Sequence, residues 1–227
     1  MRLALLFAVL LAGSAAAEGV REARYAEPTT RYDHGVLGDA VEWGALQMVT
    51  TAGRRLRVVL PATRVFEDVA PRVADVDSDG DAEVVTVESD VALGARLAVW
   101  GPDGLVAATD FIGAPHRWLA PAGIADLDGD GRVEIAFVER PHLARLLRVV
   151  RLEGGRLVPV AELAGVTNHR IGERAISGGV RDCGAGEELV LATPYWGRAV
   201  AVRFRGDTLV ARELGPIRGA LDEWLRC

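Results

Sequence analysis

The sequence predicts an all-β protein, a small β-propeller of about four four-stranded blades, with five blades as the alternative. Two observations lead to this expectation. Short runs rich in Val, Leu and Ile alternate with turn residues along the chain, and a unit headed by an aspartate recurs four times. The four aspartates, spaced 36, 51 and 56 residues apart, are Asp39, Asp75, Asp126 and Asp182.

Each unit contains the same succession of short apolar runs. The first run of each unit ends at its aspartate: Gly35–Asp39, Arg72–Asp75, Gly123–Asp126 and Gly179–Asp182. The second runs follow: Ala45–Thr50, Ala82–Glu88, Val133–Glu139 and Glu187–Thr193. The third runs are Arg55–Leu60, Arg96–Trp100, Leu147–Leu152 and Ala199–Phe204. The fourth runs are Val65–Phe66, Leu105–Thr109, Leu157–Leu163 and Leu209–Leu214. Outside these runs, only Leu221–Leu225 has the spacing of a helical turn.

The two middle units carry almost the same acidic loop, with the pattern D-x-D-x-D-G-x-x-E. Carboxylates so closely spaced repel each other unless a cation neutralises them, and oxygen ligands suit Ca²⁺. The glycine at position 6 permits a sharp turn, and position 7 adds a backbone carbonyl. The sequence therefore predicts two structural Ca²⁺ sites, with these ligands: Asp75, Asp77, Asp79, Asp81 and Glu83 in the first, and Asp126, Asp128, Asp130, Arg132 and Glu134 in the second.

These loops differ from an EF-hand, which needs a glutamate at position 12 and helices on both sides. Position 12 is Thr86 in the first loop and Phe137 in the second, and both loops run into β-rich segments. A strand–loop–strand hairpin is the expectation. Because the second loop lies between two complete units, Asp128→Ala is expected to destabilise the fold more than Asp77→Ala.

The loops and their period resemble the FG-GAP/VCBS repeat. The resemblance is strongest over residues 71–140 and weakest over 18–70, and Phe111–Pro115 is similar to the family's Phe-Gly and Gly-Ala-Pro elements. It implies a β-propeller like the head of integrin α chains, with Ca²⁺ bound between the first two strands of a blade. Position 9 is glutamate here, where the family often has aspartate.

Residues 1–17 have the pattern of a secretory signal peptide, with an apolar run from Leu3 to Ala12 and a cleavage site after Ala17. Residues 18–227 are expected to form a single domain, exported to the periplasm or secreted, with no membrane span. Cys183 and Cys227 are predicted to form a disulfide in that compartment, although two free thiols are the alternative. Residues 24–32 are expected to add a strand to the last unit and close the ring.

The formal net charge is −6, without the basic excess that a nucleic-acid partner requires. The expected partner is an unidentified protein or glycan, and the chain is expected to be a monomer. Two His-Arg pairs suggest a ligand site at one mouth of the channel: His116, Arg117, His169 and Arg170. The alternative is that these side chains only satisfy backbone carbonyls between blades.

Enzyme signatures such as G-x-S-x-G, H-E-x-x-H and a phosphate-binding loop do not occur. The sequence therefore favours an exported calcium-binding interaction or scaffold module. The alternative is a small polysaccharide-acting enzyme whose site lies at the channel mouth.

Overall fold

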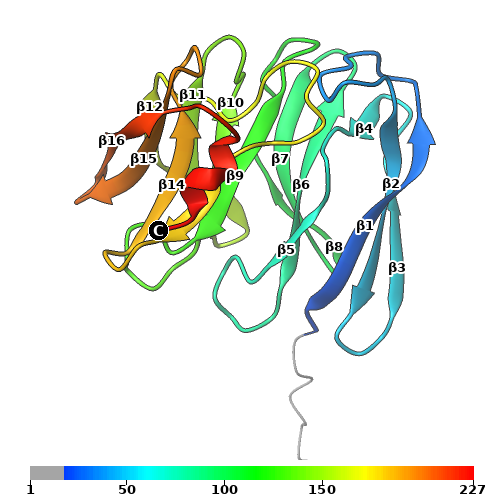
Figure 1. Ribbon diagram of the computed structural model, residues 1–227. Coiled ribbons are helices and arrows are strands. Elements are labelled where there is room, and N and C mark those ends of the chain that lie inside the picture. Colours follow the sequence, from blue (N-terminus) through cyan, green and yellow to red (C-terminus); the bar gives the residue numbers. More distant parts are fainter. Residues whose placement is uncertain (1–17) are drawn as a thin grey trace, which may run out of the picture.

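The computed structural model describes residues 18–227, so the predicted signal peptide lies outside the described residues. These residues form 16 strands in three antiparallel sheets, none of which closes on itself (Figure 1). The first sheet contains β1 (Val20–Thr29), β2 (Glu42–Thr50), β3 (Arg55–Val59), β4 (Arg64–Phe66), β5 (Arg72–Ala74), β6 (Glu83–Asp90), β7 (Gly94–Gly101) and β8 (Gly104–Ala108). The second contains β9 (Leu119–Ala125), β10 (Glu134–Glu139), β11 (Leu146–Glu153) and β12 (Arg156–Ala164). The third contains β13 (Gly179–Asp182), β14 (Glu187–Ala192), β15 (Arg198–Arg205) and β16 (Thr208–Pro216).

The all-β prediction is confirmed, but the first two units share one sheet instead of forming two. Strand β4 lies between them: Phe66 pairs with Trp43 of β2 on one side and with Glu88 of β6 on the other. The backbone groups of this short strand thus find partners in both units. The third and fourth units form the two separate four-stranded sheets.

The N-terminal segment differs most from the sequence prediction. Gly35–Asp39 is a turn and not a strand, because Gly35 and Gly38 adopt φ angles of 61° and 89°. Strand β1 pairs with β2 along its length, and the Tyr25 ring stacks on Phe66 with centroids 5.2 Å apart. The prediction that this segment joins the last unit is therefore wrong.

The hydrophobic core lies between the sheets, and the middle strands are buried on both faces. In β10, Ile135 and Phe137 pack toward the first sheet, whereas Ala136 and Val138 pack toward the third. Such two-sided burial explains why these strands read as continuous apolar runs instead of alternating ones. The acidic loops join strands of these buried sheets, so their first and last residues are held firmly.

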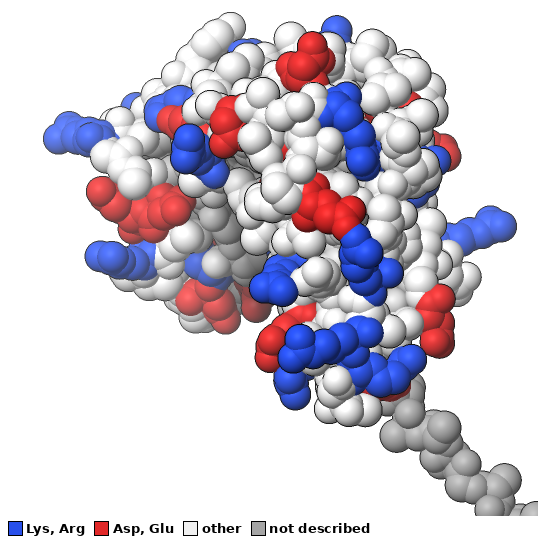
Figure 2. Space-filling view, turned by 90° about the vertical axis from the view of Figure 1, so that its right-hand side faces the viewer, with Lys and Arg blue, Asp and Glu red and all other residues white. Residues whose placement is uncertain are grey.

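The chain ends in a 3-10 helix over Leu221–Leu225, which packs against β14 with Leu221 buried. The predicted disulfide is confirmed: Cys183 is bonded to Cys227, with Cα atoms 5.6 Å apart. Within residues 18–227, no helix is long and apolar enough to cross a membrane. Figure 2 shows that arginine and acidic side chains are interspersed over the face beside β1 to β3.

Candidate metal centre

The first acidic loop connects β5 to β6 and is folded by its own carboxylates. The Asp75 carboxylate accepts hydrogen bonds from the backbone N–H groups of Asp79 (3.2 Å) and Gly80 (3.0 Å). Gly80 has φ 98°, which a side chain would strain. At the end of the loop, Glu83 Oε2 accepts the Val76 N–H at 3.1 Å. These bonds wrap the backbone around the acidic side chains.

Three carboxylates of this loop converge. Asp75, Asp77 and Glu83 each place an oxygen within 4.8 Å of the others. Burial raises the pKa of Glu83 to about 7, and the neighbouring aspartates add to the shift. Burial and Asp79 likewise raise the pKa of Asp77. Burial and mutual repulsion disfavour the ionised form of these carboxylates. A bound cation would therefore stabilise their ionised form strongly.

The second loop, between β9 and β10, repeats this geometry. The Asp126 carboxylate accepts the N–H groups of Gly129 (2.8 Å) and Gly131 (2.9 Å), and Glu134 Oε2 accepts the Leu127 N–H at 2.8 Å. Asp126, Asp128 and Glu134 also place oxygens within 4.8 Å of one another. The sequence therefore predicted correctly that these carboxylates gather, and oxygen donors of this kind fit Ca²⁺.

The remaining predicted ligands have other contacts. Asp79 Oδ1 accepts the Asp81 N–H at 2.9 Å, and Asp81 Oδ1 accepts the Gly19 N–H at 3.0 Å. In the second loop, the Arg132 guanidinium is paired with Asp130 at 2.7 Å and with Glu153 at 3.0 Å. The structure thus brings together the carboxylates at positions 1, 3 and 9 of each loop, whereas the side chains at positions 5 and 7 make these other contacts. The backbone carbonyl at position 7 stays a predicted ligand.

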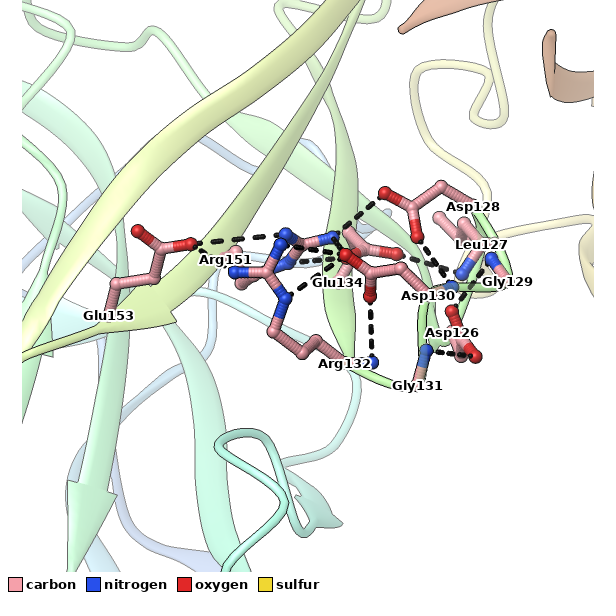
Figure 3. Close-up of polar contacts among 10 residues, drawn as sticks. All are labelled: Asp126, Leu127, Asp128, Gly129, Asp130, Gly131, Arg132, Glu134, Arg151 and Glu153. Carbon is pink, nitrogen blue, oxygen red and sulfur yellow. Dashed lines mark hydrogen bonds and ion pairs between the residues drawn. The ribbon is translucent and has the colours of Figure 1, made fainter. Parts of the chain in front are cut away.

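A buried arginine distinguishes the second loop (Figure 3). Arg151, from β11, is 5% exposed, and its Nη2 lies 2.9 Å from Asp128 Oδ2 and 3.3 Å from Asp130 Oδ2. Its guanidinium is also bonded to Glu134 Oε1, with Nε at 2.6 Å. Burial raises the pKa of Glu134, whereas the hydrogen bond from Arg151 lowers it. The sequence does not predict this contact, because Arg151 reaches the loop from another strand.

The first and fourth units, both within residues 18–227, contain no such carboxylate cluster, and their aspartates form turn hydrogen bonds instead. In the first unit, Asp39 Oδ1 accepts the Val41 N–H at 2.9 Å. In the fourth, Asp182 Oδ1 accepts the N–H groups of Gly184, Ala185 and Gly186. The fourth loop is held by this cap and by the adjoining disulfide.

A second candidate site lies where the four histidines of the chain gather. A pocket of about 260 Å³ is lined by His34, His116, Arg117, Trp118, Arg140, Pro141, His142, Leu143 and Ile171. The His34 and His116 rings stack with centroids 5.2 Å apart. Burial lowers the pKa of His142 to about 4, with His169 contributing, so this imidazole is neutral at pH 7.

The predicted four-residue ligand site is only half assembled. His116 and Arg117 line the pocket, but His169 is buried behind it. His169 Nε2 bonds to the Glu173 carbonyl at 2.8 Å, and Nδ1 lies 3.0 Å from His142 Nε2. The Arg170 guanidinium pairs with Glu173 and lies 4.0 Å from the centre of the Trp196 ring. For this second pair, the alternative of a purely structural role describes the contacts better.

Sequence reasoning missed His34, Trp118 and His142 as pocket residues. His34 comes from the loop before β2, and its Nδ1 is paired at 2.6 Å with the buried Glu67. Trp118 donates to the Glu67 carbonyl at 2.8 Å. For His34 and His142, the only sequence signal was the rarity of histidine in this chain. That rarity does not indicate which residues meet in the fold.

No family model matches the chain, and no curated protein matches it. Among solved structures, the exotype rhamnogalacturonan lyase YesX is 15% identical with a TM-score of 0.48, over 81% of this chain and 39% of the lyase. A rhamnogalacturonan lyase of Bacillus licheniformis is 12% identical with a TM-score of 0.43, over 78% of this chain and 47% of the lyase. The rhamnogalacturonan lyase YesW is 13% identical with a TM-score of 0.41, over 88% of this chain and 50% of the lyase. The chain thus spans 39% to 50% of the length of these three lyases.

Proposed function

We propose that the protein is an exported calcium-binding module of the FG-GAP/VCBS kind, whose stacked sheets are the blades of a β-propeller and whose role is to bind a protein or glycan. The observation that carries the proposal is the twofold convergence of carboxylates at positions 1, 3 and 9 of the loops. The position 9 glutamates are buried, with Glu83 8% and Glu134 0% exposed. Buried carboxylates are stabilised by a metal or a paired charge. The disulfide supports export, because such bonds persist in oxidising compartments.

Calcium is the ion that this donor set favours. Aspartate and glutamate oxygens are hard ligands, and an irregular loop suits the variable coordination of Ca²⁺. Mg²⁺ requires a tighter octahedron and gives up its water reluctantly. In the proposed role the two ions take no part in a reaction. Each ion holds one hairpin closed at its loop.

Calcium is therefore expected to raise the melting temperature of metal-free protein. At a calcium concentration about 100-fold above Kd, mass action adds about 2.7 kcal/mol. For a chain of this size that corresponds to a rise of about 5–10 °C. Thermal unfolding followed by circular dichroism, in chelator and then in excess Ca²⁺ or Mg²⁺, measures it. An identical melting curve in all three solutions would refute the proposal.

A second candidate function is action on a polysaccharide at the pocket lined by His34, His116 and His142. The observation that favours it is local backbone strain: His116 and Arg140, which both line the pocket, have φ angles of 54° and 48°. Non-glycine residues in this region are strained, and such strain clusters at functional sites. Within residues 18–227, Arg117 forms no ion pair, and its guanidinium donates a hydrogen bond to the His116 carbonyl at 3.1 Å.

Exchanging the arginines of the two His-Arg pairs for alanine tests this second candidate. Arg117→Ala is expected to weaken glycan binding or turnover by at least about tenfold, the value of one charged hydrogen bond. Arg170→Ala is the matched control, since Arg170 is engaged with Glu173 and Trp196. Binding is measured on a panel of purified polysaccharides, and turnover by the release of shorter products. Equal effects of the two substitutions would exclude the pocket.

A further inference from the structure

The two acidic loops have matching carboxylates but different surroundings. In the second loop, the Arg151 guanidinium contacts Asp128 and Glu134, two of the three converging carboxylates. In the first loop, no arginine or histidine within residues 18–227 forms an ion pair with Asp75, Asp77 or Glu83. One loop already holds a positive charge, whereas the other has none.

Strand register explains this difference. In the second sheet, Ile135 pairs with Val150 and Glu134 with Arg151, so the arginine lies directly across from the position 9 glutamate. In the first sheet, Val84 pairs with Trp100, and the next residue of β7 toward the loop is Gly101. Gly101 has no side chain to offer Glu83. A single position on the neighbouring strand thus determines whether the loop carries its own cation.

The guanidinium is also fixed in place. Arg151 is 5% exposed, and besides Asp128 and Glu134 it lies 3.3 Å from Asp130 and 3.9 Å from Glu153 (Figure 3). Moving it into solvent would leave the buried Glu134 without its partner, which is costly for a buried ion pair. A calcium ion at this loop would have to share two carboxylates with a positive charge only a few ångströms away.

We propose that Arg151 takes the place of a cation in the second loop, so that the first loop is the tighter calcium site and the second binds Ca²⁺ at least about tenfold more weakly. This inference rests on the proposed calcium-binding function and assigns the two loops different roles within it. The first hairpin depends on calcium from the surroundings, whereas the second is closed by the chain itself. The expectation from sequence that Asp128→Ala destabilises the fold more than Asp77→Ala concerns folding and not calcium affinity, and it stays a prediction.

Calcium titration by calorimetry on metal-free protein tests the inference. The intact protein is expected to show one tighter and one weaker site. Asp77→Asn should remove the tighter site, and Asp128→Asn should leave it unchanged. Arg151→Met should strengthen the weaker site by at least about tenfold. Arg148→Met is the matched control: Arg148 lies on the same strand but pairs with Glu139 and Glu162, and its loss should alter neither site.

The outcomes separate this inference from the function on which it rests. Two equally tight sites in the intact protein, or loss of the tighter site in Asp128→Asn instead of Asp77→Asn, would overturn the role of Arg151 while calcium binding stands. Absence of calcium binding to the intact protein would overturn both. The asparagine variants keep Arg151, so they decide the question even if Arg151→Met does not fold. Arg151→Lys retains the charge and should keep the second site weak.

Discussion

Glu42→Gln is expected to stabilise the protein at neutral and alkaline pH. Glu42, the first residue of β2, is 1% exposed, and its Oε2 has no hydrogen-bond partner within residues 18–227. Burial raises its pKa to about 9, and the carboxylates of Glu67, Asp39 and Asp68 add to the shift. The folded protein therefore holds a proton that the unfolded chain releases near pH 4.5.

The sign of the effect follows from this difference in proton binding. Between about pH 5 and pH 9 the folded state binds more protons than the unfolded state, so the contribution of Glu42 to stability falls as pH rises. At 1.36 kcal/mol per pKa unit, the cost at pH 7 is on the order of 3 kcal/mol. Glutamine has a similar shape without an ionisable proton, so the variant should lose this part of the pH dependence.

Urea unfolding of both proteins at a series of pH values measures the effect, because groups that are common to both cancel in the difference. Glu22→Gln is the control, since the Glu22 side chain is 67% exposed and should show no such difference. A constant gap between the Glu42→Gln protein and the parent from pH 5 to pH 9 would contradict the assignment.

Removing the disulfide is expected to cost about 4 kcal/mol, the chain-entropy value for a bridge that spans 44 residues. The double variant Cys183→Ser/Cys227→Ser avoids a leftover thiol. Other contacts keep the C-terminal segment near the third sheet: the Gly178 N–H bonds to Asp222 Oδ1 at 2.6 Å, and Arg181 bonds to the Trp224 carbonyl at 2.5 Å. The domain should therefore remain folded, with a lower denaturation midpoint.

Hydrogen exchange of the backbone amides shows which part of the protein loses stability when the disulfide is removed. Exchange should increase in residues 178–187 and 220–227, on the two sides of the bridge, and remain slow in residues 83–101 of the first sheet. Residues 20–29 should also be unaffected, because β1 pairs with β2 and not with the last sheet. The parent protein after reduction should behave like the double variant. Unchanged exchange at both ends of the bridge would show that the hydrogen bonds alone hold the segment.

Sequence reasoning succeeded where the relevant residues are close together in the chain. The alternation of acidic residues was enough to bring Asp75, Asp77 and Glu83 together, because one short loop contains all three. The same holds for most strands, whose hairpin partners follow within a few residues. The disulfide was an exception that only the compartment and the number of cysteines suggested.

The missed features depend on contacts between distant segments. Arg151 reaches Asp128 because of a cross-strand register, and His34 meets His116 although strands β2 to β8 lie between them in the chain. The place of β4 between β2 and β6 depends on a single paired residue on one side, Phe66 with Trp43. Local spacing carries no information about these pairings, since they are decided by how whole sheets pack.

The position of β4 has a consequence for the modularity of the chain. The boundary between the first two units is crossed by strand pairing from β4 to β2 and to β6. Separating the two units there would leave a sheet edge with unpaired backbone groups. The first two units thus share one continuous sheet, whereas the second and third sheets each contain the strands of a single unit.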